Sequence, residues 1–250
     1  MKAKLFLLIA VLGSLAGTAT AGDVSPVQSS ARPFGLQPYA PVMQSGSDAR
    51  AADFNQNYLP SFLELVNQHL AERAVFTDRE GFHLDAKRLF LRTESDETIR
   101  VYFISEGAGY RNTLGFSMTP AGSETPGDSH LVFPNASFHG LSSDRRTQSA
   151  PLVVGDFVDL STGGPGIQLD FFCIADGARN PRNVWFNNKD LNADGMQHVV
   201  AFLMPGTRYV LIGFEDLWGG GDLDYNDCLF VVDIGEINAE NLFDESTLPH

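Results

Sequence analysis

Residues 209–234 read YVLIGFEDLWGGGDLDYNDCLFVVDI, two apolar runs separated by an acidic, glycine-rich segment. The runs, Tyr209–Phe214 and Cys228–Ile234, each have the length and composition of a buried β-strand. The segment between them contains Gly219–Gly221, three successive glycines that permit positive φ angles and hence a sharp turn. We therefore predict two strands joined by a folded acidic loop.

Short runs of the same kind recur along the chain from about residue 81 to residue 235, with clusters of Gly, Asn, Asp and Pro between them. Many short strands with turn signals and no interleaved helices predict a mainly β fold, an antiparallel β-sandwich or jelly-roll-like domain. The predicted strands are Arg88–Arg92, Thr98–Ser105, Thr113–Met118, Leu131–Pro134, Phe157–Leu160, Gln168–Ala175, Asn183–Phe186, His198–Leu203, Tyr209–Phe214 and Cys228–Ile234.

The segments outside this domain have other patterns. Apolar residues recur at three- and four-residue steps over Asp53–Arg73, which predicts one amphipathic helix that Pro60 either kinks or begins, within a helical element spanning 53–80. Residues 22–52 form a predicted flexible linker, because Pro, Ser, Gln and Gly are frequent there without periodicity. Residues 236–250 are predicted to be an acidic tail.

The first 21 residues have the pattern of a signal peptide. Lys2 and Lys4 precede an apolar stretch from Leu5 to Ala16, and Ala19-Thr-Ala21 fits a signal-peptidase site. We expect an exported protein, periplasmic or secreted, with no membrane insertion after cleavage, since the apolar stretch is shorter than the roughly 20 residues of a spanning helix. No later segment is a sorting or anchoring signal, so a freely exported form is expected.

The chain is strongly acidic. Its formal net charge is −14, and loss of residues 1–21 leaves 15 basic and 31 acidic residues, a charge of −16. Nucleic acid is therefore not an expected partner, because phosphate binding needs clustered Lys and Arg. The acidity fits an exported protein whose carboxylates are partly neutralised by cations, or one in which charge only maintains solubility.

Cys173 and Cys228 are the only cysteines, and each lies in a predicted buried strand. In an oxidising compartment the pair can form a disulfide, which would stabilise by a few kcal/mol. The alternative is two separate thiols that behave as small hydrophobic side chains.

Oxygen-bearing side chains crowd the loop after Phe214. Calcium takes six to eight oxygen ligands in flexible geometry, and so many carboxylates in one turn would repel one another without a cation. Asp, Asn and Gly are also turn formers in their own right, which is the alternative explanation. The predicted ligands here are Glu215, Asp216, Asp222, Asp224, Asn226 and Asp227.

A second calcium-like pattern lies upstream at residues 190–195. Asp190, Asn192 and Asp194, followed by Gly195, give the opening of a calcium loop, and are predicted to form a second or shared site. The twelfth position, where a helical hand needs Glu, is Ala201, so we predict loop-borne sites on a β-scaffold. Zinc is disfavoured, because the histidines show no paired spacing; His198, three residues after the loop, is more typical of a structural residue.

The block Phe214–Asp227 resembles the signature of an exported bacterial family known as domain of unknown function 4114, which occurs also in LruC-type proteins. Ile104–Phe116, Phe171–Gly177 and Asp190–Val200 resemble further parts of it, so the likeness covers about Thr98–Ile234. It implies a secreted or surface-associated β-rich module suspected of binding calcium. It does not imply an enzymatic activity, because the family name records an undetermined role. Cys173 and Cys228 stand where the family would be expected to have aliphatic residues.

Three functions are consistent with these patterns. The first is a calcium-binding structural, adhesive or matrix-associated module whose partner is an extracellular glycan or a surface protein. The second is calcium-dependent carbohydrate binding, in which Trp218 and Trp185 are candidate stacking platforms, although Trp218 can equally cover the metal site. The third is a polysaccharide-acting enzyme with Glu106, beside Tyr110–Asn112, as its best catalytic candidate; no recognised catalytic motif supports it.

Overall fold

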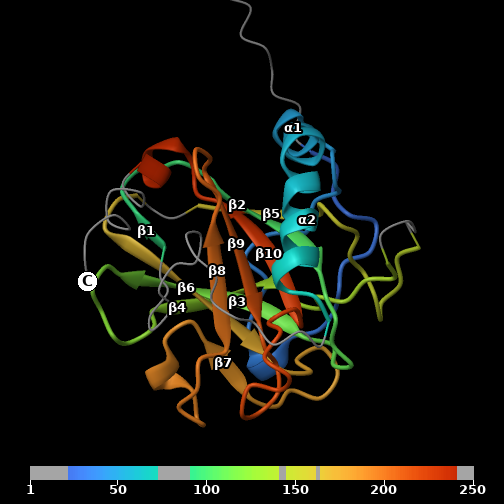
Figure 1. Cartoon of the computed structure of the whole chain (residues 1–250), viewed down its shortest axis with the longest axis vertical. Coiled ribbons are helices and arrows are strands. Elements are labelled where there is room, and N and C mark those ends of the chain that lie inside the picture. The colour runs from blue at the N-terminus through green and yellow to red at the C-terminus, as the bar shows by residue number, and fades with distance from the viewer. Residues whose placement is uncertain (1–21, 73–90, 141–144, 162–163, 241–250) are drawn as a thin grey trace, which may run out of the picture.

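The computed structural model describes residues 22–72, 91–140, 145–161 and 164–240, and within them the chain forms a β-sandwich of two antiparallel sheets (Figure 1). The first sheet has the order β5-β2-β10-β9-β8, and the second has the order β1-β6-β3-β4, with β7 also paired to β6. The strands are β1 Leu91–Thr93, β2 Ile99–Ser105, β3 Thr113–Pro120, β4 Asp128–Phe133, β5 Phe157–Leu160, β6 Ile167–Ile174, β7 Val184–Phe186, β8 Val199–Leu203, β9 Tyr209–Phe214 and β10 Cys228–Asp233. The predicted fold class is confirmed, and each predicted strand overlaps one of these ten.

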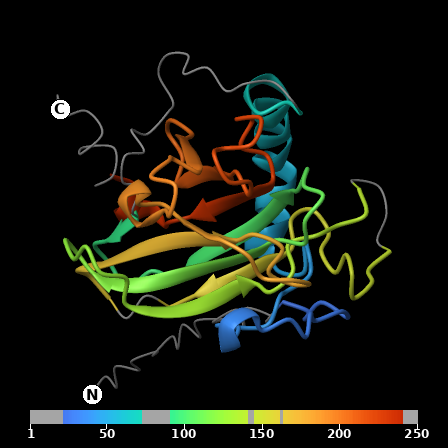
Figure 2. The same cartoon turned by 90° about the horizontal axis from the view of Figure 1, so that it is seen from below.

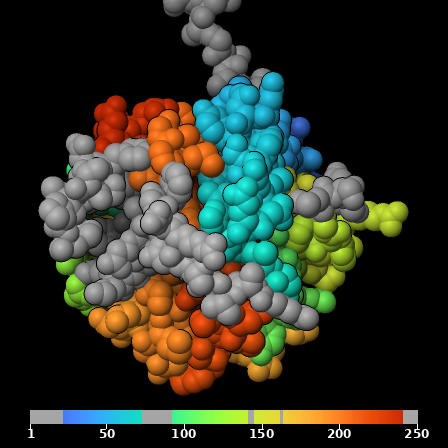
Figure 3. Space-filling view, in the orientation of Figure 1, coloured from blue at the N-terminus to red at the C-terminus, as the bar shows by residue number. Residues whose placement is uncertain are grey.

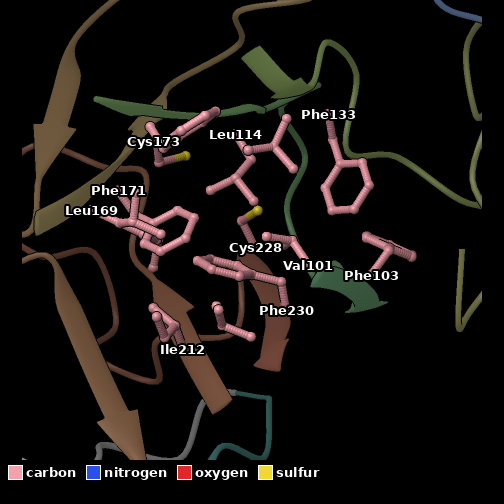
Figure 4. Packing of buried hydrophobic residues seen from close by; sticks show 14 of the residues in the cluster. Val101, Phe103, Leu114, Phe133, Leu169, Phe171, Cys173, Ile212, Cys228 and Phe230 are labelled. Atoms are coloured by element: carbon pink, nitrogen blue, oxygen red, sulfur yellow. The ribbon is translucent and has the colours of Figure 1, made fainter. Parts of the chain in front are cut away.

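The main core lies between the two sheets and is built from the inward-facing residues of both. Phe171 of β6 packs on Phe230 of β10 with ring centroids 5.2 Å apart, and Figure 4 shows these rings meeting in the middle of the core. Such burial of aromatic and aliphatic surface is the dominant stabilising contribution to a fold of this size.

The helical region covers the outer face of the first sheet (Figures 1 and 3). The Phe54 ring stacks on Tyr102 of β2, with ring centroids 3.9 Å apart. It also packs against Tyr209 of β9, with ring centroids 5.3 Å apart. Strand β10 is therefore buried on both faces: Phe230 faces the core and Val231 faces the helices. This explains why its sequence is continuously apolar, since alternation is expected only where one face meets water.

The predicted single helix is in fact two helices, α1 Ala49–Asn57 and α2 Leu59–His69. Helix α1 begins earlier than predicted because the Asp48 side chain accepts a hydrogen bond from the Ala51 N–H at 2.7 Å and caps it. The break falls at Tyr58, and Pro60 lies in the first turn of α2, where its missing N–H is tolerated.

The segment predicted as a flexible linker lies against the sandwich in its described part, residues 22–52. Met43 and Phe157 exchange backbone hydrogen bonds of 2.8 and 3.1 Å at the edge of the first sheet. Tyr39 N–H bonds to the Leu131 carbonyl at 2.9 Å at the edge of the second sheet, below which Figure 2 shows this segment in blue. Edge strands β5 and β4 thus gain backbone partners, which is a common way to protect an edge. Short 3₁₀ turns, η1 Pro33–Gly35 and η2 Lys189–Leu191, and a helical turn over residues 236–240 complete the described elements. This helical turn stands at the start of the predicted acidic tail and packs on the main core through Ala239.

The possible disulfide is not formed, and the alternative of two separate thiols holds, since Cys173 and Cys228 are both free and fully buried. Cys173 lies on β6 and Cys228 on β10, so their side chains enter the core from opposite sheets (Figure 4). Hydrogen bonding with Cys228, together with burial, raises the pKa of the Cys173 thiol. The cysteines therefore behave as small core residues, and a thiol held protonated is a poor nucleophile.

We expect neither thiol of the native protein to react with a thiol reagent such as DTNB, and both to react once the protein is unfolded. The measurement is a thiol count with and without guanidinium chloride, on protein that has never been reduced. A count of zero in guanidinium chloride would show a disulfide and would contradict the free thiols described above.

Candidate metal centre

The acidic loop, residues 215–227, connects β9 to β10 at one end of the sandwich. Its backbone takes positive φ at five positions, Gly219–Gly221 (77°, 80° and 51°), Leu223 (61°) and Tyr225 (54°). For Leu223 and Tyr225 this conformation costs of the order of 1 kcal/mol or more each, so surrounding contacts must stabilise it. Gly213 lets the loop pack closely over β9, since a Cβ there would lie 2.3 Å from the Tyr225 carbonyl oxygen.

Glu215 is the internal anchor of this loop. Its side chain is fully buried, and Oε1 accepts hydrogen bonds from the backbone N–H groups of Asp224 at 2.8 Å and Tyr225 at 3.1 Å. Oε2 is buried and has no hydrogen-bond partner among the described residues. Burial, followed by the nearby charges of Asp224 and Asp222, raises the pKa of Glu215 to about 7. A buried oxygen without a partner is costly, so this atom favours a bound proton or cation.

Three carboxylates converge beside Glu215. Glu72, just after α2, and Asp222 and Asp224 of the acidic loop each place one oxygen within 4.8 Å of the other two. Asp224 is 1% exposed, whereas Glu72 and Asp222 are open to solvent. These three residues are called the carboxylate cluster below.

Asn226 borders the carboxylate cluster and fixes its geometry. Its Nδ2 donates to the Leu70 carbonyl at 3.3 Å, and its own carbonyl accepts from the Gly107 N–H at 3.1 Å. Asn226 Oδ1 and Glu72 Oε2 both lie over Gly107, where a Cβ would come within 2.4 and 3.1 Å of them. The amide oxygen of Asn226 is therefore placed to join the carboxylates around one cation.

Asp216 and Asp227 lie outside the carboxylate cluster and form a separate pair, which Asn112 holds in place. Asn112 Nδ2 donates to Asp216 Oδ2 at 2.7 Å, and the Asp216 N–H donates to Asp227 Oδ2 at 2.9 Å. Burial and the neighbouring Asp216 charge raise the pKa of Asp227 to about 9, and burial also raises that of Asp216. Glu106 lies near Asp216, and burial raises its pKa to about 7.

A pocket of about 570 Å³ opens beside this pair. Its walls are the loop of residues 107–110, Arg179 and part of the acidic loop. Asp222 borders this pocket and also belongs to the carboxylate cluster, so the two features adjoin.

In the loop of residues 190–195, side-chain oxygens of two residues accept hydrogen bonds from other protein groups. Asn192 Oδ1 accepts from the Phe186 N–H at 2.7 Å, and Asp194 Oδ2 accepts from the Gly219 N–H and from His198 Nε2, both at 2.9 Å. Although burial alone would raise it, hydrogen bonds from Gly219, Met196 and His198 lower the pKa of Asp194 to about 2. The 190–195 loop thus supports the acidic loop through hydrogen bonds, while Asp190 is exposed.

The two tryptophans have different environments. Trp185 is fully buried, stacks on His198 with ring centroids 3.8 Å apart and donates from Nε1 to the Asp216 carbonyl at 2.7 Å. It therefore presents no face to a sugar, contrary to the stacking role predicted for it. Trp218 is 60% exposed and touches Trp185 edge-on at 6.0 Å between centroids.

Of the predicted ligands, the structure brings Asp222, Asp224 and Asn226 together, with Glu215 buried beside them. It places Asp216 and Asp227 in the neighbouring pair and engages Asn192 and Asp194 in structural hydrogen bonds. Glu72 was not predicted, because it is some 150 residues away in sequence and stands in a stretch with no metal-binding pattern.

One family model matches part of this chain. Residues 164–235 match the family described as Domain of unknown function (DUF4114). The match spans β6 to β10 and includes the acidic loop and the 190–195 loop, but neither α2 with Glu72 nor the 107–110 loop. No curated protein and no solved structure matches the chain.

Proposed function

We propose that this protein is an exported calcium-binding β-sandwich module in which calcium fixes the acidic loop against the end of α2. The observation that carries the proposal is the carboxylate cluster, Glu72, Asp222 and Asp224, with the buried and unpartnered Oε2 of Glu215 next to it. The donors are oxygens alone, from carboxylates and an amide, which is the set that calcium prefers over zinc.

The role supported best is structural. A cation in the cluster would join the acidic loop to Glu72, two segments whose carboxylates otherwise repel one another. We infer an adhesive or matrix-associated protein in which calcium stiffens this end of the sandwich for a surface partner. Export remains a prediction from residues 1–21, which lie outside the described residues, and none of the described helices has the length and apolarity to cross a bilayer.

Calcium should bind weakly and stabilise the protein. Extracellular modules bind calcium at about 10⁻⁴ to 10⁻³ M. With a Kd of about 1 mM, 10 mM calcium would add about 1.4 kcal/mol to the free energy of unfolding. For a chain of this size that corresponds to a rise in Tm of about 3–6 °C. Isothermal titration and thermal unfolding of chelator-treated protein measure the two quantities.

Variants locate the site. Asp222→Asn combined with Asp224→Asn, and separately Glu72→Gln, should abolish the calcium-induced rise in Tm, because each removes charge while keeping side-chain shape. Glu64→Gln, an exposed change on α2, and Asp190→Asn, in the 190–195 loop, should leave the rise unchanged. The proposal fails if wild type shows neither heat nor a shift in Tm, or if the double variant responds as wild type does.

A further inference from the structure

The pocket beside Asp216 and Asp227 has chemistry that the calcium proposal does not use. Asp216 and Asp227, which lie outside the carboxylate cluster, border its volume of about 570 Å³ together with Asp222, which belongs to that cluster. Asp216 is 3% exposed and accepts a hydrogen bond from Asn112, and Asp227 accepts one from the Asp216 N–H, so this pair is held in place. Pre-positioned charge of this kind loses little entropy when a ligand binds.

Among the described residues that border the pocket, the cationic one is already paired with another carboxylate. Arg179 also borders the pocket, but its guanidinium is paired with the buried carboxylate of Asp176, with contacts of 3.0 and 3.2 Å. Glu106, at the base of the 107–110 loop, adds a further acidic group near Asp216. The field in the pocket therefore attracts a cation and does not favour an anion.

The rest of the wall is apolar. Ala108, Tyr110 and Leu217 border the pocket, and Leu217 is 45% exposed. The Arg182 guanidinium lies 5.0 Å from the centre of the Tyr110 ring and holds that ring in position. An occupant should therefore combine a positive charge with an aliphatic portion.

We propose that this pocket binds a primary ammonium group at the end of an aliphatic chain, as carried by a lysine side chain or a free alkylamine. The ammonium lies against Asp216 and Asp227, where its N–H donors meet carboxylate oxygens, and the methylene groups lie along Leu217 and Tyr110. A bare divalent ion is far smaller than the pocket, and one oxygen of each aspartate already accepts a hydrogen bond. A neutral polyol would not compensate the negative charge that the Asp216 and Asp227 pair carries.

The test compares ligands that differ only in charge, in 10 mM calcium so that the carboxylate cluster is occupied. n-Pentylammonium is paired with 1-pentanol, and Nα-acetyl-lysine N-methylamide with Nα-acetyl-norleucine N-methylamide. Isothermal titration should detect both amines and neither neutral partner. If pentylammonium alone binds, the pocket is specific for free amines; binding of the lysine derivative extends this to a lysine on a partner protein.

Asp227→Asn should weaken amine binding about tenfold or more, the usual effect of removing a hydrogen-bond acceptor from a charged ligand. Leu217→Ser should also weaken amine binding, because it removes apolar surface along which the methylene groups of the ligand lie. Glu64→Gln should change the affinity for the amine less than twofold. The inference is overturned if 1-pentanol binds as well as the amine, if Asp227→Asn binds the amine as wild type does, or if added calcium displaces the amine one for one. Asp227 lies outside the carboxylate cluster, so calcium titration of Asp227→Asn without amine distinguishes failure of this inference from failure of the calcium proposal.

Discussion

Replacing Trp185 with alanine is expected to lower the free energy of unfolding by about 3–5 kcal/mol, the usual cost of truncating a fully buried tryptophan. The side chain belongs to the main core and stacks on His198, the residue before β8, with ring centroids 3.8 Å apart. Its loss also leaves the Asp216 carbonyl, at the start of the acidic loop, without the Trp185 Nε1 donor. We therefore expect a weaker calcium response in addition to the lost stability.

Two companion variants separate volume from hydrogen bonding. Trp185→Phe keeps most of the ring but removes the donor, so we expect a loss of about 1–3 kcal/mol, the cost of an unsatisfied buried acceptor. Trp218→Ala removes an exposed ring and its edge contact with Trp185, which should cost about 0.5–1.5 kcal/mol. Urea unfolding at fixed calcium gives all three values. Equal losses for Trp185→Ala and Trp218→Ala would contradict the structural role assigned to Trp185.

The strands were predictable because their signal is local. Runs such as Cys228–Val232 are apolar on both faces, since the second face is covered by α1 and α2, and turn residues mark their ends. The pairing of the strands was not predictable, because β10 lies between β2 and β9 through contacts far apart in sequence. The start of α1 was missed because its cap, Asp48, precedes the apolar periodicity.

The candidate site was predictable only in part, because the partners of its residues also lie far apart in sequence. An Asp-x-Asn-x-Asp-Gly pattern has the same composition whether its oxygens bind calcium or backbone N–H groups, and only the three-dimensional partners of Asn192 and Asp194 distinguish the two. Glu72 joins the carboxylate cluster because α2 ends beside the acidic loop, which no short pattern encodes. Likewise, sequence showed that Cys173 and Cys228 are buried but gave no information on whether they are bonded.

The metal-free protein should lose stability as the pH rises from about 5 to about 9. The pKa of Glu215 is about 7 and that of Asp227 about 9 in the folded protein, both above the ordinary values of 4.5 and 3.8. Between the ordinary and the folded pKa, the folded state binds more protons than the unfolded state does. Protonation of these two carboxyl groups therefore stabilises the folded protein fully at low pH. This stabilisation is lost as the pH rises through the folded pKa of each group. For the fully buried Glu215 the loss is of the order of a few kcal/mol.

Calcium should stabilise the protein more as the pH rises, which is opposite to the trend of the metal-free protein, because its ligands must be ionised before they bind it. The calcium-induced rise in Tm is therefore expected to be larger at pH 8 than at pH 5.5, and stability in 10 mM calcium should depend less on pH. Thermal unfolding in chelator and in calcium across this range measures both effects. A metal-free protein that became more stable from pH 5 to pH 9 would contradict the burial of these carboxylates.

Glu215→Gln is the variant that links the two effects. Glutamine can still accept from the Asp224 and Tyr225 N–H groups but carries no charge to bury, so metal-free stability at pH 8 should rise. The calcium response should fall sharply, because the unpartnered oxygen beside the carboxylate cluster is gone. Glu106→Gln is the matched control, since the pKa of Glu106 is also about 7 but its side chain lies outside the cluster. It should flatten the pH dependence while leaving the calcium response intact, and equal calcium responses in the two variants would show that Glu215 has no part in the site.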